Sequence, residues 1–378
     1  MDSSPLDPRA VALAVSIVRR CGPSHPADAV LRETLRGERG LGADTAAGVA
    51  RGVFATFRWR GWLENPADVA GAVALEEQFE REPARFAEAD LLARAVPAWA
   101  REELDVTPAW VRQLQTRPAL WLRARPGQAE SLAARLGECR LSGALPDAVE
   151  FLGQRDLFRT PELHAGEFEI QDIASQAVGR VCGAQPGETW WDACAGEGGK
   201  TLHLSDLMGN KGLIWASDRA DWRLRRLKLR AARAKTFNYR AVAWDGGAKL
   251  PTRTRFDGVL VDAPCSGLGT WQRNPHARWT TTPEDVRELA AVQARLLDHV
   301  APSVKPGARL IYAVCTVTRA ETDGVTTAFE AAHPDFEPLA LANPFPAGTT
   351  SRANALLWWP QDTRGNGMYV VAWRRKPA

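Results

Sequence analysis

The chain lacks the features of membrane proteins, zinc ribbons and disulfide-rich proteins. No apolar run approaches the about 20 residues that a membrane-spanning helix needs. Its first residues, MDSSPLDPRAVALAV, contain no basic segment followed by a long apolar core. The six cysteines lie far apart without a C-x-x-C pair. We therefore expect no membrane association, no metal, and a reducing, cytoplasmic location in which thiols stay free.

The chain also has little net charge. Its formal charge is only +3 over 378 residues, and its apolar and charged fractions are those of an ordinary globular protein. Any nucleic-acid site must therefore come from local basic patches rather than from an overall field. The length is enough for two or three domains.

The sequence predicts three domains. Residues 1–115 have apolar residues at helical spacing, broken by Gly-Pro, Asn-Pro and Glu-Pro, and contain no catalytic constellation. Residues 116–165 predict a small α+β linker domain. Residues 166–378 alternate strands with helices, which favours an α/β, Rossmann-like domain with a mostly parallel sheet. The predicted strands are Thr189–Trp191, Leu213–Ser217, Ala241–Trp244, Val259–Val261 and Leu310–Val314, and Leu356–Trp359 with Gly367–Trp373 predicts a closing hairpin.

A glycine-rich loop follows the first strand of this domain and opens a helix. It reads Cys194, Ala195, Gly196, Glu197, Gly198, Gly199, Lys200. Glycines there permit a tight turn and a close approach of the backbone to a ligand. Asp218 ends the second strand, 20 residues after Gly198, and Asp245 ends the third. Such carboxylates suit the hydroxyls of a ribose; alternatively, each of them only caps a helix.

Three ligands compete for this loop. ATP requires G-x-x-x-x-G-K-[ST], and although Gly199-Lys200-Thr201 fits, Cys194 occupies the place of the first glycine. NAD requires G-x-G-x-x-G, a spacing that the loop lacks. S-adenosyl-L-methionine carries no phosphate, so the loop need only approach its methionine part while Asp218 and Asp245 hold ribose and adenine. We favour S-adenosyl-L-methionine.

Two thiols and a carboxylate end further strands of the same domain. Asp262 and Cys265 follow the fourth strand, and Cys315 follows the fifth. A methyl donor alone does not explain two thiols, but carbon 5 of a pyrimidine does. It becomes nucleophilic only after an addition at carbon 6, for which a thiolate is well suited, and a neighbouring acid can hydrogen-bond the ring nitrogen. The residues alone do not rank the two thiols, and a single cysteine is more often a small buried apolar residue.

The strings DACAGEGGKT, VDAPCSGLGT and YAVCTVT, in this order, resemble those of the Sun/NOP-type RNA cytosine-5 methyltransferases. The resemblance covers about residues 120–378, including Gln171-Asp172-x-x-Ser175-Gln176 and Arg273-Asn274-Pro275. It implies that Cys315 is the nucleophile and that Cys265 assists release of the methylated product. It also implies that Cys194–Lys200, Asp218, Asp245 and Asp262 contact S-adenosyl-L-methionine or the base.

The chain departs from the family pattern at three places. Glu197 stands where the family usually has proline, and Cys315 is followed by Thr-Val-Thr rather than by the commoner serine. Leu122-Arg123-Ala124 lacks an asparagine that often follows this arginine. None of these changes removes a catalytic group. The N-terminal helices resemble, by pattern only, the helical NusB-like RNA-binding module of small-subunit rRNA members of the family.

Two segments have the composition of RNA-binding surfaces. The first is a predicted helix with apolar Leu224, Leu227, Ala231 and Ala234 toward the sheet, and it either binds phosphates or forms a solvated surface. Its basic residues are Arg219, Arg223, Arg225, Arg226, Lys228, Arg230, Arg233 and Lys235. The second follows Cys265 and interleaves cations with aromatic rings, which suits a flipped base and its neighbours. It comprises Trp271, Gln272, Arg273, His276, Arg278 and Trp279.

The resulting hypothesis is a monomeric enzyme that methylates carbon 5 of a cytosine in rRNA, most simply small-subunit rRNA. A tRNA cytosine-5 methyltransferase is the alternative within the same class. From another class, an RNA-binding ribosome assembly factor without catalysis would keep the fold, but the intact Asp262, Cys265 and Cys315 speak against it.

Overall fold

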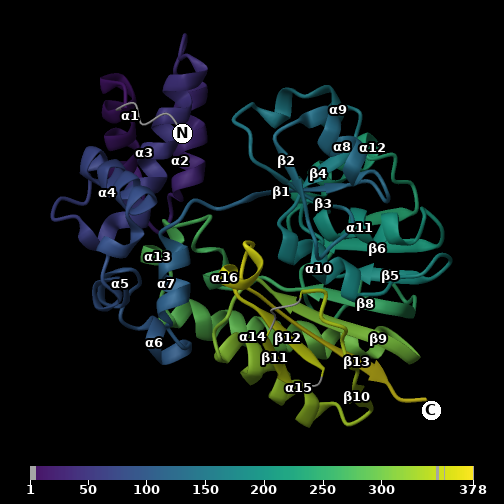
Figure 1. Cartoon of the computed structure of the whole chain (residues 1–378). Coiled ribbons are helices and arrows are strands. Elements are labelled where there is room, and N and C mark those ends of the chain that lie inside the picture. Colours follow the sequence, from purple (N-terminus) through teal and green to yellow (C-terminus); the bar gives the residue numbers. More distant parts are fainter. Residues whose placement is uncertain (1–5, 346–348, 353, 378) are drawn as a thin grey trace. The chain divides into compact units, whose positions relative to one another are not determined.

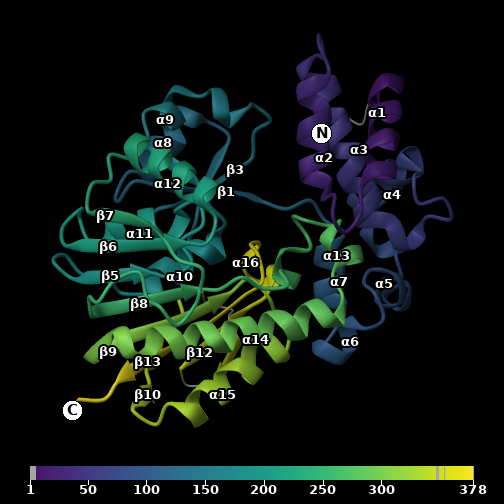
Figure 2. The same ribbon diagram turned by 180° about the vertical axis from the view of Figure 1, so that it is seen from behind.

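The computed structural model describes residues 6–345, 349–352 and 354–377, which form two compact units. The first unit contains the chain up to Pro118 together with Gly267–Asp285. The second contains Ala119–Ser266 and the chain from Val286 onward. Figures 1 and 2 show the helices of the first unit and the sheets of the second from opposite sides.

The first unit is helical, as predicted for the N-terminal part. Asp7 caps its first helix by accepting a hydrogen bond from the Arg9 backbone amide at 3.0 Å. Ala14 and Ile17 of this helix are buried against Val53 of the third. The helices are α1 (Pro8–Arg20), α2 (Ala27–Gly37), α3 (Ala43–Trp59), α4 (Val69–Arg81), α5 (Glu88–Arg94), α6 (Ala100–Glu103), α7 (Pro108–Leu114) and, from the second segment, α13 (Ala277–Thr280).

The second unit begins with a small antiparallel sheet of order β2-β3-β1-β4. Leu122 of β1 and Val149 of β3 are fully buried beside Leu132 of α8, so this helix covers one face of the sheet. The elements are β1 (Leu120–Ala124), α8 (Ala129–Leu136), β2 (Cys139–Leu141), β3 (Ala148–Phe151), α9 (Pro161–His164) and β4 (Phe168–Ile170).

A larger sheet forms the body of the second unit, in the order β11-β12-β13-β9-β8-β5-β6-β7, with β10 paired to β13. Its five strands from β7 to β9 are parallel, and β13 joins β9 in the antiparallel sense. The Rossmann-like sheet and the closing hairpin are thus confirmed. The strands are β5 (Thr189–Asp192), β6 (Leu213–Asp218), β7 (Tyr239–Ala243), β8 (Phe256–Asp262), β9 (Val304–Val314), β10 (Phe336–Pro338), β11 (Thr349–Arg352), β12 (Ala355–Trp358) and β13 (Met368–Arg375).

Helices cover both faces of this sheet because side chains alternate along each buried strand. Tyr312 and Val314 of β9 enter one apolar cluster, whereas Ile311 and Ala313 enter another on the opposite face. In Figure 2, α14 runs along the near face of the sheet. One face carries α10 (Ile173–Val181), α11 (Gly199–Leu207) and α12 (Asp221–Arg233), the other carries α14 (Pro283–Val300) and α15 (Val325–Ala332), and α16 (Pro360–Thr363) precedes β13.

The strand order reverses direction between β5 and β8. From β5 the chain proceeds to β6 and β7 on one side, and it then crosses to β8 and β9 on the other. Open α/β sheets bind ligands outside the carboxyl ends of the strands at such a reversal. The glycine-rich loop follows β5, Asp262 ends β8, and Cys315 follows β9, so the topology brings these segments to one edge.

The predicted domain boundaries near residues 115 and 165 remain a prediction. The two compact units differ from them in two respects. The segment predicted as a separate linker domain lies in the same unit as the Rossmann-like sheet, and Gly267–Asp285, which the sequence places in the Rossmann-like domain, packs with the helices of the first unit.

Candidate functional site

The two thiols meet at the carboxyl edge of the large sheet. Cys265 follows β8 and Cys315 follows β9, and these neighbouring parallel strands pair Asp262 with Ala313. The two Sγ atoms lie 3.2 Å apart, neither cysteine is in a disulfide, and both are half-buried. The structure therefore places two thiols where both can reach one small substrate.

Lys200 and Asp262 form an ion pair at the same edge, with Nζ 2.6 Å from Oδ2. Burial lowers the pKa of Lys200, but the charge and hydrogen bond of Asp262 outweigh it, so that this pKa is raised overall. Lys200 is 8% exposed, whereas the Asp262 side chain remains 29% exposed. The carboxylate is therefore the more exposed member of the pair.

The glycine-rich loop needs glycine at two positions of left-handed backbone. Gly196 has φ +55° and Gly198 has φ +87°, and a Cβ at Gly198 would lie 2.6 Å from Cγ of Leu227. The loop is held from α12, where Arg230 donates to the Glu197 carbonyl at 3.0 Å and Arg226 lies 3.4 Å from its carboxylate. The acidic departure at Glu197 thus has a basic partner in this chain.

Asp218 and Asp245 lie at the ends of the neighbouring strands β6 and β7. Asp218 is buried, and its two oxygens accept the backbone amides of Gly196 at 3.0 Å and Ala220 at 2.8 Å. Asp245 is exposed and accepts the Gly247 amide at 2.8 Å. Both acids therefore order their loops, and because a carboxylate oxygen has two lone pairs, each keeps acceptor capacity for a ligand.

The sequence interpretation missed Asp192, the last residue of β5. It is fully buried, and Oδ2 accepts a hydrogen bond from Thr201 Oγ1 at 2.6 Å, whereas Oδ1 has no hydrogen-bond partner among the described residues. Burial raises the pKa of Asp192 to about 7. The sequence signal that could have identified Asp192 is its place as the acid that begins the string DACAGEGGKT.

Burial, reinforced by Asp192 and Asp262, also raises the pKa of Cys194, which makes that cysteine a poor nucleophile.

The basic helix α12 is only partly available to a ligand. As predicted, Leu224, Leu227 and Ala231 are buried against the sheet. Arg230 and Arg233, however, both lie 2.9 Å from the buried carboxylate of Glu169, so these two cations hold β4 against the helix. The exposed basic residues of the helix and its flanks are Arg219, Arg223, Arg225, Arg226, Lys228 and Lys235.

The prediction of RNA contacts for Trp271, Gln272, His276 and Arg278 is contradicted by their burial. Arg278 is fully buried and donates to four main-chain carbonyls, those of Arg58, Ala95, Leu114 and Trp271, at 3.0–3.3 Å.

The other members of this segment are also part of the first unit. Trp271 stacks on Trp110 with ring centroids 6.1 Å apart, and Gln272 donates to Thr116 Oγ1 at 2.8 Å. The half-buried Trp279 donates to the Phe57 carbonyl at 2.7 Å. Trp271, Gln272, Arg278 and Trp279 are therefore structural parts of the helical unit.

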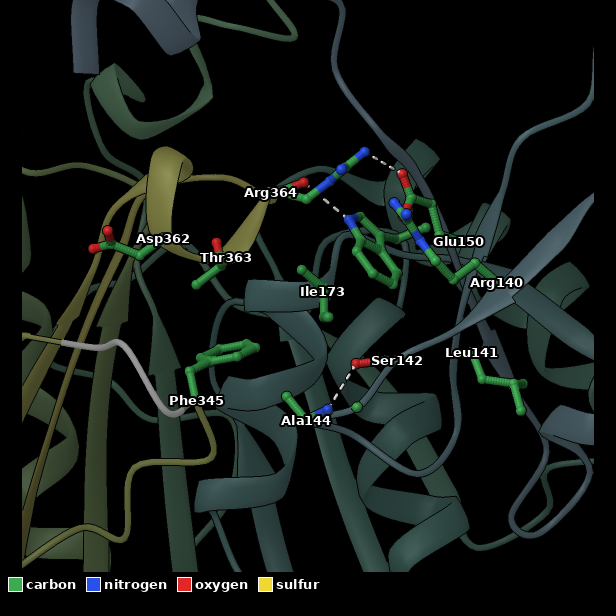
Figure 3. Close-up of a pocket in the computed structure, with 12 residues that line it drawn as sticks. Arg140, Leu141, Ser142, Ala144, Glu150, Ile173, Phe345, Asp362, Thr363 and Arg364 are labelled. Atoms are coloured by element: carbon green, nitrogen blue, oxygen red, sulfur yellow. Dashed lines mark hydrogen bonds and ion pairs between the residues drawn. The ribbon is translucent and has the colours of Figure 1, made fainter. Parts of the chain in front are cut away.

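A pocket of about 400 Å³ in the second unit is built by residues other than the predicted site. Its size suits a small ligand, but its two arginines are engaged: Arg140 and Arg364 both point to the buried Glu150, with Arg364 Nη2 2.8 Å from Oε1 (Figure 3). The lining residues are Trp121, Arg140, Leu141, Ser142, Gly143, Ala144, Glu150, Ile173, Phe345, Asp362, Thr363 and Arg364.

Neither a membrane span nor a metal centre is found among the residues that the structure describes. None of these helices combines the length and apolarity needed to cross a bilayer. No cluster of three or more His, Cys, Asp or Glu in the described ranges could hold a metal ion.

Comparison with known proteins gives a consistent picture of relatedness. A family model described as 16S rRNA methyltransferase RsmB/F matches residues 181–374, just over half of the chain. The probable ribosomal RNA small subunit methyltransferase B of Synechocystis is 32% identical over 287 residues, which cover 72% of this chain and 63% of that protein. The match therefore spans less than two thirds of this curated relative.

Two solved structures share the fold. The crystal structure of PH0851 covers 99% of this chain and 100% of its own, with a TM-score of 0.81 at 22% identity. The crystal structure of NSun6 from Pyrococcus horikoshii with SFG covers 71% of this chain and 94% of its own, with a TM-score of 0.64 at 17% identity. These likenesses confirm the predicted Rossmann-like fold class.

Proposed function

Because this chain belongs to the 16S rRNA methyltransferase RsmB/F family, we propose that it methylates carbon 5 of a cytosine in small-subunit rRNA, using S-adenosyl-L-methionine. The observation that carries the proposal is the pair of reduced thiols 3.2 Å apart beside the Lys200–Asp262 ion pair. Cytosine-5 chemistry needs a reversible thiolate addition and a second group to resolve the adduct, and this edge offers both.

The residues of the edge fit the methyl donor. When bound, S-adenosyl-L-methionine supplies an electrophilic methyl group on a cationic sulfonium. A Cβ at Gly196 would meet nothing within 4 Å, so the loop borders open space. The unpartnered Oδ1 of Asp192 suits a cationic or hydroxyl donor, and Asp218 and Asp245 suit the ribose and adenine. NSun6 with SFG, which has the same fold, lends the cofactor assignment further support.

The first chemical step belongs to Cys315. Its thiolate forms a bond to carbon 6 of cytosine, and the ring electron pair moves toward carbon 5, which becomes nucleophilic. The ionised Asp262 accepts a hydrogen bond from the exocyclic amine of cytosine, since that amine is a donor. Lys200, 2.6 Å from Asp262, donates toward the ring as negative charge develops. Asp262 thus acts as the hydrogen-bond acceptor for the base and Lys200 as the donor, so neither residue has to serve in both roles.

The second step belongs to Cys265. After methyl transfer, carbon 5 carries both the methyl group and a proton. The Cys265 thiolate removes this proton, the electron pair restores the ring double bond, and the bond from carbon 6 to Cys315 breaks. The separation of 3.2 Å between the two Sγ atoms lets both act on one pyrimidine.

The RNA target is tested by bisulfite sequencing of rRNA and tRNA from a strain that lacks the gene. We expect a cytosine of 16S rRNA to lose its methylation and to regain it when the gene is restored. Loss confined to a tRNA cytosine would replace the rRNA assignment with the tRNA alternative. An unchanged map in both RNAs would contradict the proposed activity and favour an RNA-binding role without catalysis.

A further inference from the structure

A buried carboxylate joins the loops that carry the two thiols. Glu321 is fully buried and lies in a π-helical turn, Ala320–Gly324, shortly after Cys315. Its Oε1 accepts the Ser266 backbone amide at 2.8 Å, and its Oε2 accepts the hydroxyl of the same Ser266. Ser266 directly follows Cys265, so one carboxylate holds the backbone next to that thiol at two points.

The same carboxylate holds the Cys315 loop. Thr318 Oγ1 donates to Oε2 at 2.8 Å, and Thr316 Oγ1 lies 2.9 Å from the Ser266 hydroxyl. Thr316 and Thr318 belong to the Thr-Val-Thr segment that follows Cys315 in place of the commoner serine. Their hydroxyls keep the loop bonded to Glu321 and Ser266, so the departure preserves the network.

A third segment completes the network from α14. Gln293 Nε2 donates to Glu321 Oε1 and to the Pro264 carbonyl, both at 2.9 Å. The Tyr312 hydroxyl reaches Gln293 Oε1 at 2.8 Å and the Glu321 carbonyl at 2.6 Å. Glu321 thus receives four donors, as many as an ionised carboxylate accepts, and they arrive from three segments. Buried networks with every member satisfied rigidify their surroundings.

We propose that Glu321 is a positioning residue that holds the Cys265 and Cys315 loops together and so sets the distance between the two thiols. Its meaning for catalysis rests on the proposed function, because both thiols must act on one adduct. A small loop displacement separates two groups that share a substrate, and such misplacement costs rate even far from the chemistry.

The test measures thiol proximity without RNA or methyl donor. Dibromobimane becomes fluorescent when it bridges two neighbouring thiols, and Cys265→Ala sets the background from the other cysteines. We expect Glu321→Ala to slow bridging about tenfold, equivalent to about 1.4 kcal/mol. Glu321→Gln should recover part of the rate, because its amide can donate to the hydroxyls of Ser266 and Thr318, which also accept.

Glu169→Ala is the matched control. Glu169 is equally buried and holds Arg230 and Arg233, but it does not contact the thiol loops, so its variant should bridge at the wild-type rate. Bridging of Glu321→Ala at the wild-type rate would overturn the inference. If that variant does not fold, Thr318→Val is measured instead. Slower bridging by Thr318→Val is expected, and bridging at the wild-type rate would contradict the inference.

The outcomes separate this inference from the proposed function. If bridging depends on Glu321 while no RNA is methylated, the positioning role stands and the proposed function fails. If RNA is methylated but the bridging rate does not depend on Glu321, the proposed function stands and the positioning role fails. In a working enzyme, Glu321→Gln should lower kcat with KM unchanged and accumulate some protein–RNA adduct, which a purely structural role would not produce.

Discussion

Two stretches that are close in the sequence have opposite structural roles. Asp262–Ser266 ends a buried strand and presents a carboxylate and a thiol that remain partly exposed. Trp271–Trp279 is richer in arginine and tryptophan, yet Trp271 and Arg278 are fully buried in the helical unit. In this chain, a composition typical of RNA binding therefore did not predict an exposed surface, whereas position at a strand end did predict which side chains lie close together.

The largest effect should come from the strand-end edge. Lys200→Met keeps the length of the side chain but leaves Asp262 without its ammonium partner, so charge on the cytosine ring is no longer stabilised. We expect the methylation rate to fall about 10²–10⁴-fold, measured by transfer of labelled methyl groups to 16S rRNA.

Lys211→Met is the control for this change, since Lys211 is exposed and precedes the amino end of β6, opposite to the strand ends that carry the predicted site. It should retain a methylation rate near that of the wild type. A Lys200→Met enzyme of full activity would remove the ion pair from the mechanism.

The buried segment should respond in stability instead. Arg278→Met leaves four main-chain carbonyls without their donor, so we expect the free energy of unfolding to fall by at least about 2 kcal/mol. Urea denaturation of the two proteins measures this difference.

An exposed arginine provides the comparison for Arg278. Arg225→Met should change stability by no more than about 0.5 kcal/mol. If Arg278→Met kept full stability and lost only RNA affinity, the segment would be an RNA surface after all.

Substitution of Asp192 tests whether the burial of an acid at the strand-end edge lowers the stability of the protein as the pH rises. Its pKa is raised to about 7 in the folded protein, above about 3.9 in the unfolded chain. The contribution of Asp192 to the free energy of unfolding is therefore fully present below the unfolded pKa. It is lost as the pH rises through about 7, by up to about 1.4 kcal/mol per pH unit. In the Asp192→Asn protein, the free energy of unfolding should no longer fall with pH between these two pKa values, as measured by urea unfolding. A decrease equal to that of the wild type would contradict the raised pKa.

The smallest effect should come from the basic helix. Lys228→Met should reduce the slope of log affinity against log salt by about 1 if Lys228 contacts a phosphate, measured with an rRNA fragment. Arg230→Met, which frees Glu169 from one of its partners, should lower stability more than it changes the salt slope. Identical salt slopes for Lys228→Met and wild type would assign this face of α12 to solvent.

The sequence predicted those parts that depend on local pattern and topology. Alternating strands and helices identified the sheet, and parallel strands must place their carboxyl ends at one edge, so Lys200, Asp262, Cys265 and Cys315 could be grouped in advance.

Long-range packing was not predictable in this way. The donors to Glu321 include Ser266 and Gln293, which are 55 and 28 residues away along the chain. The carbonyls around Arg278 include those of Arg58 and Ala95 from distant helices. Nothing local to either residue shows that its charge is buried, since only the folded neighbours supply its partners.

The most direct test of the account is the covalent adduct with target RNA. Incubated with 16S rRNA and methyl donor, Cys265→Ala should accumulate a denaturation-resistant protein–RNA complex. Cys315→Ala and the double variant should form none and transfer no methyl group. A Cys315→Ala protein that still methylates RNA, or an adduct that persists in the double variant, would contradict the assignment of the two thiols.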